Sequence, residues 1–358
     1  MKKIIKKVIA VVLGISLATG FGAGFGRQST KVQAREIGNI TLGTQYTGTA
    51  PSESNPDIYN FSFEVTGKLT IHFQAKNHIY INCRITDSDG KGIAGWRTER
   101  QNLETTGVVY LKKGNYNLVM ATDYMGSNVS YIFSTEFTPI KDTNPELQTS
   151  NNDTKYSASD ISNFLGKSIC SVLTNDETTD IFKFTMPSNG SFQIQFSKCI
   201  EDLDLYLEDS YGEISYENGD IVQGNVYEFY LAKGTYYLTL YSKGNHGENN
   251  FKPSTSALTT TKLSSVKNTK KGNLTVSWKR KATADGYCVQ VATDAKFKKL
   301  LENYTFDSTV SKGYFENTKF KKGKTVYVRV CICVKAGRYQ DKEIRSKWSS
   351  VKKLKLKK

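Results

Sequence analysis

The stretch DIYNF at residues 57–61 recurs as DIFKF at residues 180–184, and this repetition decides the fold. The stretch GKLTIHF at 67–73 recurs at the same offset of 123 residues, as GSFQIQF at 190–196. A unit this long is a whole domain, because solenoid repeats span only about 20–45 residues. The sequence therefore predicts two copies of one domain in tandem.

Apolar and polar residues alternate along both copies. Leu69, Ile71 and Phe73 form one apolar row, and LKKGNYNL at 111–118 is matched by LAKGTYYL at 231–238. Period-two alternation, bounded by Gly, Asn, Asp and Ser, is typical of antiparallel strands with one buried face. No stretch has a sustained helical period. We therefore expect an all-β protein made of antiparallel β-sandwiches.

Residues 1–34 have the features of a secretory signal peptide. Four lysines precede a short apolar run at 8–17, and a small-x-small cleavage site ends at Ala34. The run is shorter than the ~20 residues that span a bilayer, which argues against the alternative of a retained membrane anchor. We expect cleavage after Ala34 and a secreted, extracellular or cell-wall-associated protein with no transmembrane anchor.

Polar connectors divide the mature chain. Residues 139–159 contain two prolines and an Asn-Asn-Asp run, and residues 254–261 are rich in Ser and Thr. We expect the first copy at 35–138, the second copy at 160–253 and a third domain at 262–358. The strand pattern of the third domain fits a seven-strand immunoglobulin-like sandwich.

The third domain resembles a fibronectin type III domain, in the lysine-rich form found on exported bacterial proteins. The matching residues are Trp278, the Gly-Tyr-x-Val-x-Val motif at 286–291, and Trp348-Ser349 before the last strand. One position departs from the pattern. The family's corner tyrosine should fall at Val326, and Tyr327 points outward instead, so we expect the corner hydrogen bond to be lost or replaced.

The repeated unit resembles the bacterial pre-peptidase C-terminal domain, which is similar to the collagen-binding domain of bacterial collagenases. The resemblance rests on the Asp-x-Tyr/Phe-x-Phe motif, on DLDLYL at 202–207 and on the Leu-x-Lys-Gly-x-Tyr-x-Leu motif. It implies eight- or nine-strand, jelly-roll-like sandwiches that bind matrix or polysaccharide beside a catalytic unit. In the second copy the chain from Tyr241 to Asn250 is rich in Gly and Asn, so its last strand is not evident.

Charge is divided unevenly along the mature chain. Residues 35–259 hold 17 Lys and Arg against 27 Asp and Glu, a net charge of −10, whereas residues 260–358 hold 26 against 7, a net charge of +19. In an exported protein, such a basic domain suits anionic cell-wall polymers, anionic lipid or acidic glycans rather than nucleic acid. Solubility alone is the alternative explanation.

Three carboxylates form a candidate calcium site in the second copy. Asp176 and Glu177 shortly precede Asp180, and Ca²⁺ prefers several oxygen ligands of this kind. Some members of the resembled family bind calcium near this point. A polar turn capped by Asp180 explains the same residues, because a full set of 6–8 oxygen ligands is not visible. Calcium is therefore an open prediction, and no other cofactor is expected.

Outward aromatic side chains give the candidate ligand-binding residues. By strand phase, Tyr80 and Arg84 lie opposite a buried row, Trp96 follows a Gly-rich loop, and Tyr206 shares a face with two aspartates. Aromatic platforms beside polar groups serve glycans and extended peptides alike. An alternative role for Trp96 is to cap the end of the sandwich, since large aromatic residues are usually well buried.

No catalytic motif is evident. A hydrolase needs a nucleophile beside a base, or two apposed carboxylates. His72 faces outward in a strand, His78 lies at a turn and His246 lies in a Gly/Asn loop, and none belongs to a known catalytic motif. We predict that the protein is not an enzyme.

The chain contains six cysteines: Cys83, Cys170, Cys199, Cys288, Cys331 and Cys333. They are too few for a dense disulfide framework in a chain of this length. Cys83 is interpreted as a buried small hydrophobe. Cys170 and Cys199 share a domain, and no spacing rule decides whether they pair. The last three point outward on strands that are neighbours in the resembled fold. A disulfide between Cys288 and one of the other two is a hypothesis, with reduced thiols as its alternative.

These observations together predict a non-catalytic, secreted or surface-associated binding or adhesion protein. The repeats are expected to recognise an extracellular protein or polysaccharide, and the basic domain to contact an anionic cell-wall polymer. Two alternatives stay open. One is a secreted hydrolase or an accessory subunit of one, and the other is a structural spacer without a saturable ligand.

Overall fold

The computed structural model describes residues 35–357 except for short gaps at 51–52, 77–79, 101, 123–128, 142–146, 148–151, 213 and 337–341. The expected signal peptide and His78 lie outside the described residues. The described part consists of β-strands and loops with a 3-10 turn at Ser162–Phe164. None of its helical segments has the length and apolar character needed to cross a membrane. The predicted all-β fold is confirmed.

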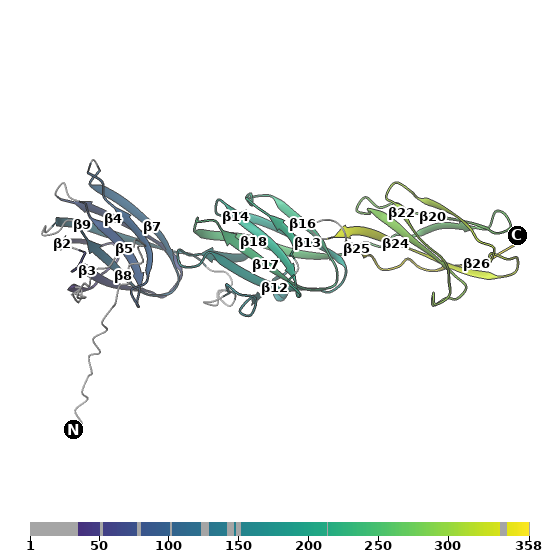
Figure 1. Ribbon diagram of the computed structural model, residues 1–358, viewed down its shortest axis with the longest axis horizontal. Helices are drawn as coiled ribbons and strands as arrows, with labels where there is room; N and C mark the ends of the chain where they lie inside the picture. The colour runs from purple at the N-terminus through teal and green to yellow at the C-terminus, as the bar shows by residue number, and fades with distance from the viewer. Residues whose placement is uncertain are drawn as a thin grey trace, which may run out of the picture. The chain divides into compact units, whose positions relative to one another are not determined.

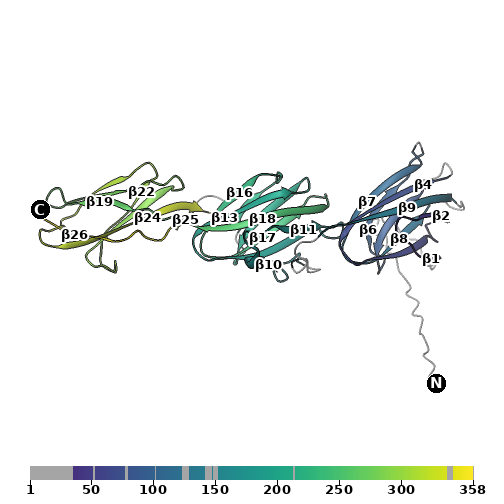
Figure 2. The same ribbon diagram turned by 180° about the vertical axis from the view of Figure 1, so that it is seen from behind.

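The chain divides into two compact units. The first unit reaches Asp142 and also includes Val172–Thr178, whereas the second comprises Thr143–Ser171 and Thr179–Lys358. The first unit contains one β-sandwich and the second contains two, each built from its own pair of sheets (Figures 1 and 2).

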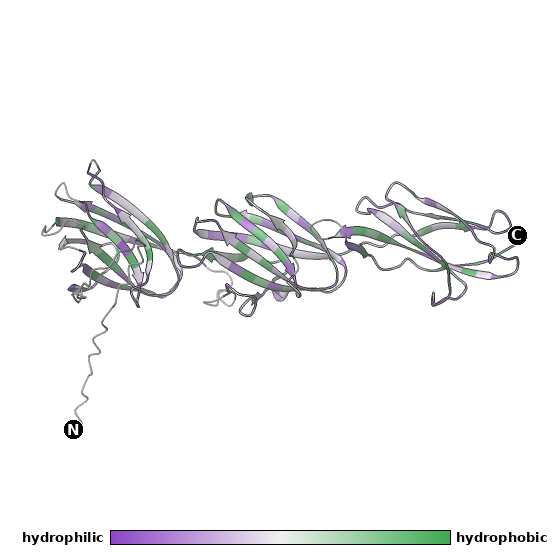
Figure 3. Ribbon diagram, in the orientation of Figure 1, coloured by the Kyte–Doolittle hydropathy of each residue, from purple (hydrophilic) through white to green (hydrophobic). Residues whose placement is uncertain are grey.

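Nine strands form the first sandwich in the described residues. They are β1 (Arg35–Asn39), β2 (Gln45–Ala50), β3 (Asp57–Phe63), β4 (Gly67–Ala75), β5 (Asn82–Asp87), β6 (Gly92–Arg97), β7 (Glu104–Leu111), β8 (Gly114–Ala121) and β9 (Val129–Pro139). One sheet has the order β1-β3-β8-β5-β6 and the other has the order β2-β9-β4-β7. Apolar residues alternate with polar ones along the strands, so one face of each sheet is buried (Figure 3).

The second sandwich repeats this topology strand for strand. Its strands are β10 (Ser159–Asp160), β11 (Ile169–Leu173), β12 (Thr179–Met186), β13 (Gly190–Lys198), β14 (Leu203–Asp209), β15 (Ile214–Asn218), β16 (Val226–Leu231), β17 (Gly234–Ser242) and β18 (Gly247–Ala257). The sheets have the orders β10-β12-β17-β14-β15 and β11-β18-β13-β16. The repeat seen in the sequence is therefore a repeat of the fold, with nine strands in each described copy.

The last strand of the second copy is present although its sequence gives little sign of it. β18 pairs with β13 from Asn250 to Ala257, which lies beyond the expected domain end at 253 and within the expected 254–261 linker. Its buried row begins with Gly247 and Asn249 and continues with Phe251. A strand whose buried row starts with small and polar residues does not produce the usual apolar alternation.

Two edge pairings differ from the antiparallel expectation. β1 pairs with β3 in parallel, and β10 pairs with β12 in parallel. In each copy the chain continues from this edge strand into the opposite sheet, to β2 or β11. Because no hairpin joins the paired strands, their direction is not fixed as antiparallel.

The third sandwich has the seven strands of the expected immunoglobulin-like fold, with the last one split in two. Its elements are β19 (Leu263–Lys267), β20 (Asn273–Trp278), β21 (Gly286–Ala292), β22 (Leu300–Asp307), β23 (Lys312–Glu316), β24 (Thr325–Ala336), β25 (Lys342–Arg345) and β26 (Lys352–Lys355). β19, β20 and β23 form one sheet, and the other has the order β22-β21-β24-β25 with β26 also paired to β24.

Side chains replace part of the backbone ladder at the break between β25 and β26. The N–H groups of Ile332 and Val330 donate to the hydroxyls of Ser346 and Ser349, at 3.0 and 3.1 Å. The two serine N–H groups donate back to the carbonyls of the same residues. The segment 346–351 thus stays attached to β24 while it bulges across the sheet.

The missing corner tyrosine is replaced in part. Val326 is buried, and Tyr327 faces away from the core as expected. The buried Tyr287 hydroxyl accepts a hydrogen bond from the N–H of Lys281 at 2.6 Å and contacts the carbonyl of the same residue at 3.3 Å. Tyr287 on β21 therefore holds the loop at Lys281 by a hydrogen bond to its backbone, as the corner tyrosine of the resembled domains would hold a different loop.

Candidate functional site

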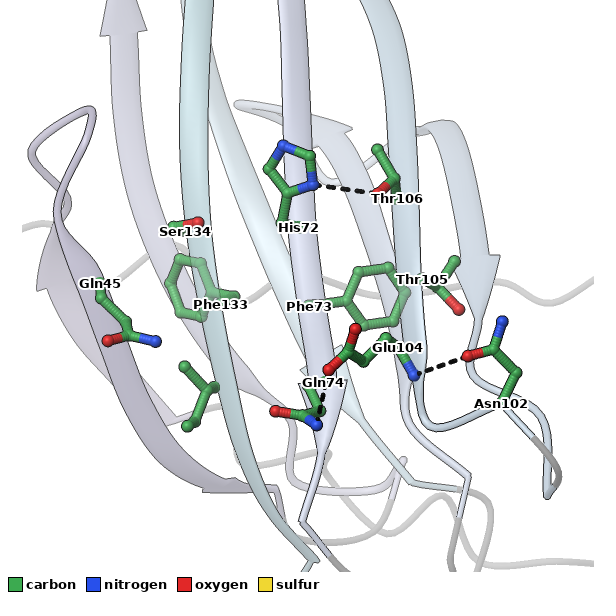
Figure 4. Close-up of a pocket in the computed structure, with 11 residues that line it drawn as sticks. Gln45, His72, Phe73, Gln74, Asn102, Glu104, Thr105, Thr106, Phe133 and Ser134 are labelled. Atoms are coloured by element: carbon green, nitrogen blue, oxygen red, sulfur yellow. Dashed lines mark hydrogen bonds between the residues drawn. The ribbon is translucent and has the colours of Figure 1, made fainter.

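A polar groove lies on the outer face of the β2-β9-β4-β7 sheet in the first sandwich (Figure 4). Polar side chains such as those of His72 and Gln74 line it because every second residue of a strand points away from the core. Its volume is about 590 Å³. The lining residues are Gln45, His72, Phe73, Gln74, Asn102, Glu104, Thr105, Thr106, Ile132, Phe133 and Ser134.

Hydrogen bonds organise this groove, two of them between neighbouring strands. His72 Nδ1 lies 3.0 Å from the Thr106 hydroxyl, and the Gln74 side-chain amide donates to Glu104 at 2.9 Å. The backbone N–H of Glu104 donates to the side chain of Asn102 at 3.2 Å. Amide, hydroxyl and imidazole groups in one groove can exchange hydrogen bonds with the hydroxyls of a glycan or the amides of a peptide.

A second, basic groove lies on the outer face of the β19-β20-β23 sheet in the third sandwich. Its volume is about 700 Å³, and Lys267, Lys270 and Lys312 line it together with Glu316. The three lysines are exposed and form no ion pair with the described residues. Around one carboxylate and three ammonium groups the local potential is positive, which attracts anionic ligands.

An exposed tyrosine stands in the basic groove. Tyr314 is 71% exposed, and the Lys312 ammonium lies 4.9 Å from the centre of its ring. Tyr314 pairs with Thr275 of β20, whose short side chain leaves the ring uncovered. The next residue inward, Gly313, packs so closely against Phe306 that an added Cβ would lie 2.5 Å from that ring. Glycine at this position lets β23 approach the core and fixes Tyr314 as the outward residue.

None of the residues that line the basic groove was predicted from the sequence as a ligand residue. The signal was present, because KGYFE at 312–316 alternates and places a lysine, a tyrosine and a glutamate on one face. The net charge of the domain indicated its sign, but the charge alone could not show which of its lysines share a face with an aromatic ring.

Tyr80 and Arg84, two of the predicted ligand residues, already have protein partners. The guanidinium of Arg97 lies 4.1 Å from the centre of the Tyr80 ring, and that of Arg100 lies 5.8 Å away. Arg84 lies 3.5 Å from the carboxylate of Glu53. These residues form two separate local clusters and do not line either groove.

Trp96 and Tyr206 are also engaged by the protein. Trp96 pairs with Cys83 and packs on the core, with its ring so close to Gly107 that an added Cβ there would lie 2.4 Å away. This position matches the alternative role of capping the sandwich. The Tyr206 hydroxyl lies 3.4 Å from Asp204, a buried carboxylate that also pairs with Lys243 at 3.0 Å.

The three predicted calcium ligands are distributed among protein partners. Glu177 forms an ion pair with Lys112, Asp176 accepts a hydrogen bond from Thr174 at 2.6 Å, and the buried Asp180 accepts one from Ser171. Among the described residues, no group of three or more His, Cys, Asp or Glu side chains is arranged to hold a metal ion. A calcium ion at Glu177 would have to displace an ammonium group, so the residues as arranged do not fit calcium well.

Neither groove contains the carboxylate pair that glycoside hydrolysis requires. Glu104 is the carboxylate that lines the first groove, and Glu316 is the one that lines the second. Glycosidases in general use two carboxyl groups about 5–10 Å apart. His72 Nδ1 is hydrogen-bonded to the Thr106 hydroxyl rather than to a carboxylate.

No family model matches the sequence, and no curated protein matches it. Several solved structures do match the fold. The pre-peptidase C-terminal domain of collagenase from Bacillus anthracis is 17% identical with a TM-score of 0.25, and the match covers 30% of this chain and 100% of that one. A two-domain fibronectin type III segment of chicken tenascin is 14% identical with a TM-score of 0.26, covering 49% and 97%.

A third match is the glycoside hydrolase domain of Endo-D from Streptococcus pneumoniae R6. It is 12% identical with a TM-score of 0.20, and the match covers 52% of this chain but 33% of that one. Both domain types expected from the sequence are represented among the solved structures. At these identities and TM-scores the likeness does not bear on ligand or activity.

Proposed function

We propose that this chain is a non-catalytic binding protein, secreted or held at the cell surface, whose third sandwich contacts an anionic polymer through the basic groove. The observation that carries the proposal is the arrangement of Lys267, Lys270 and Lys312 around the exposed ring of Tyr314. Ammonium groups attract phosphate or carboxylate groups, and an exposed aromatic face packs against sugar rings. A polymer that alternates sugars or polyols with anionic groups fits both features.

The first sandwich has a role of a different kind in this proposal. Its groove is lined mainly by uncharged polar groups, with Gln74 and Glu104 already bonded to each other. This chemistry suits a neutral glycan or an extended peptide better than a polyanion. The chain would then join a polymer-retaining module to a recognition module, which is the arrangement of an adhesion protein.

Binding of the mature chain to immobilised heparin, as a polyanion probe, and to isolated bacterial cell walls tests the basic groove. The triple variant K267Q/K270Q/K312Q should weaken binding at least tenfold at low salt and flatten its salt dependence, because exposed charges are screened at high ionic strength. The matched control K296Q/K298Q/K299Q removes three equally exposed lysines outside the groove.

The two triple variants together distinguish binding by the groove from binding by net charge. An equal loss in both would show that net charge, and not the groove, causes retention. Unchanged binding in the groove variant would overturn the proposal. Tyr314→Ala should reduce cell-wall binding while leaving the salt dependence intact, since it removes the aromatic face and no charge.

A further inference from the structure

Three cysteines lie together on the outer face of the third sandwich. Cys288 of β21 and Cys331 and Cys333 of β24 are all at most 2% exposed. They lie on the face opposite the core, as the strand phase predicted, and they are buried because Trp348 packs over them. All three are thiols in the structure.

The strand register singles out one pair among these thiols. Cys288 lies directly opposite Cys331, whereas Cys333 lies opposite Gly286. The N–H groups of Val330 and Ile332 point away from β21, toward Ser349 and Ser346. Because successive N–H groups point to opposite edges of a strand, Cys331 must bond to β21 and forms a hydrogen-bonded pair with Cys288.

The Cα separation of such a pair lies within the range of disulfides. Hydrogen-bonded antiparallel pairs have Cα atoms about 5.5 Å apart, and disulfides usually span 4.4–6.8 Å. The two side chains leave the same face of adjacent strands. By contrast, Cys331 and Cys333 are two residues apart on one extended strand, where the separation of ~6.6–6.8 Å lies at the upper limit.

We infer that Cys288 and Cys331 form a cross-strand disulfide when the protein is oxidised, and that Cys333 remains a thiol beside it. This disulfide would join the two central strands of the sheet, β21 and β24. It would close a long loop between residues 288 and 331 and therefore restrict the unfolded chain. It is independent of which ligand the basic groove takes.

The surroundings identify Cys288 as the attacking group. A hydrogen bond from the Cys331 thiol lowers the pKa of Cys288, and the positive charge of Arg345 acts in the same direction against the effect of burial. The pKa of Cys331 is raised, mainly by its hydrogen bond to Cys288 and next by that to Cys333. The thiolate is the reactive form in thiol–disulfide exchange.

A disulfide can oxidise the Cys288 and Cys331 thiols, and it is either oxidised glutathione or the active-site disulfide of an oxidoreductase. The Cys288 thiolate attacks one sulfur, a mixed disulfide forms, and the first thiol of the oxidant leaves. The Cys331 sulfur then attacks Cys288 and releases the second thiol. Two protein thiols are oxidised to one disulfide, the oxidant is reduced to two thiols, and the two protons end on the released thiols.

Peptide mapping without reductant tests the inference on the full mature chain, refolded in a glutathione buffer and then alkylated in denaturant. Trypsin should release residues 282–296 linked to residues 330–335, with Cys83 alkylated. Because the second peptide contains both Cys331 and Cys333, variants must separate them. Cys333→Ala should keep the cross-link, and Cys331→Ala should lose it.

A thermal measurement supplies an independent readout if a variant folds poorly. Reductant should lower the unfolding midpoint of the third sandwich by about 10 °C in wild type and in Cys333→Ala, and by nothing in Cys331→Ala. A cross-link that depends on Cys333 instead of Cys331 would overturn the assignment. So would complete alkylation of all three thiols after oxidative refolding.

Discussion

Arg35 holds the buried carboxylate of Asp57 through two hydrogen bonds, from Nε to Oδ1 at 2.8 Å and from Nη2 to Oδ2 at 2.9 Å. Asp57 is fully buried, and the hydroxyl of Tyr131 donates to it at 2.6 Å. The Tyr59 hydroxyl lies 2.7 Å from that of Tyr131. This network fixes the parallel edge strand β1 against β3 and gives the repeated Asp of the DIYNF motif a structural role in the first copy.

Arg35→Met should destabilise the first sandwich by about 2 kcal/mol. Losing one partner of a buried ion pair costs about 3–5 kcal/mol, but the Arg35 side chain is 51% exposed, so solvent reduces the effect. Calorimetry, with hydrogen exchange of peptides covering β1 and β3, measures it. Lys113→Met is the matched control, because the Lys113–Glu64 pair is mostly exposed and should contribute about 0.5 kcal/mol or less. Equal effects would contradict the role of Asp57.

Alkaline pH should weaken the same network. Burial, and next the hydrogen bond to Asp57, raises the pKa of Tyr131 above its ordinary value, and burial also raises that of Tyr59. A raised pKa gives stability that is complete below the unfolded value of about 10 and is lost as pH rises above it. Tyr131→Phe should be less stable than wild type at pH 7, and this difference should shrink above pH 10. A constant difference across that range, measured by urea unfolding, would exclude the mechanism.

The fold was predictable to the extent that packing depends on apolar alternation. The rows Leu69/Ile71/Phe73 and Phe192/Ile194/Phe196 are buried as the repeat implied. β18 was harder to find because its buried row begins with Gly247 and Asn249, which have no apolar signal. The parallel pairing of the edge strands was also not predicted. Whether two strands pair in parallel depends on where the chain goes between them and not on composition.

The candidate sites were less predictable than the fold. Strand phase placed His72 on the outer face correctly, but it could not show that Thr106, Gln74 and Glu104 meet beside it across two strands. The exposure of Trp96 depended on Gly107, a residue of the opposite sheet. The grouping of these side chains and the exposure of Trp96 both depend on how strands far apart in the chain are aligned. A single sequence does not show that alignment.

Calcium should have little effect on the wild-type protein. Glu177 is paired with Lys112, so a divalent ion would have to displace a bound ammonium group. We expect millimolar calcium chloride, compared with EDTA, to leave the unfolding midpoint unchanged. Lys112→Met removes the competitor and should make any calcium stabilisation larger than in wild type. A clear calcium-induced rise in the wild-type midpoint would instead support the carboxylates 176, 177 and 180 as a site.

Trp348 should control chemical access to the cysteines beneath it. The guanidinium of Arg329 lies 4.0 Å from the ring centre of Phe297 and 4.1 Å from that of Trp348, so the tryptophan is held in place by a stacked cation. Gln290 fixes that cation by accepting hydrogen bonds from Arg329 at 2.9 and 2.6 Å.

Trp348→Ala should therefore raise the rate at which iodoacetamide labels Cys288 in the folded, reduced protein by about tenfold or more, because local opening no longer has to displace a packed ring. Arg329→Lys should have a smaller effect in the same direction, since lysine keeps the charge but cannot stack as a plane. Cys83 is buried in the first sandwich and serves as an internal control whose labelling should not change. Equal acceleration at Cys83 would point to general unfolding, and unchanged labelling of Cys288 would show that Trp348 does not guard it.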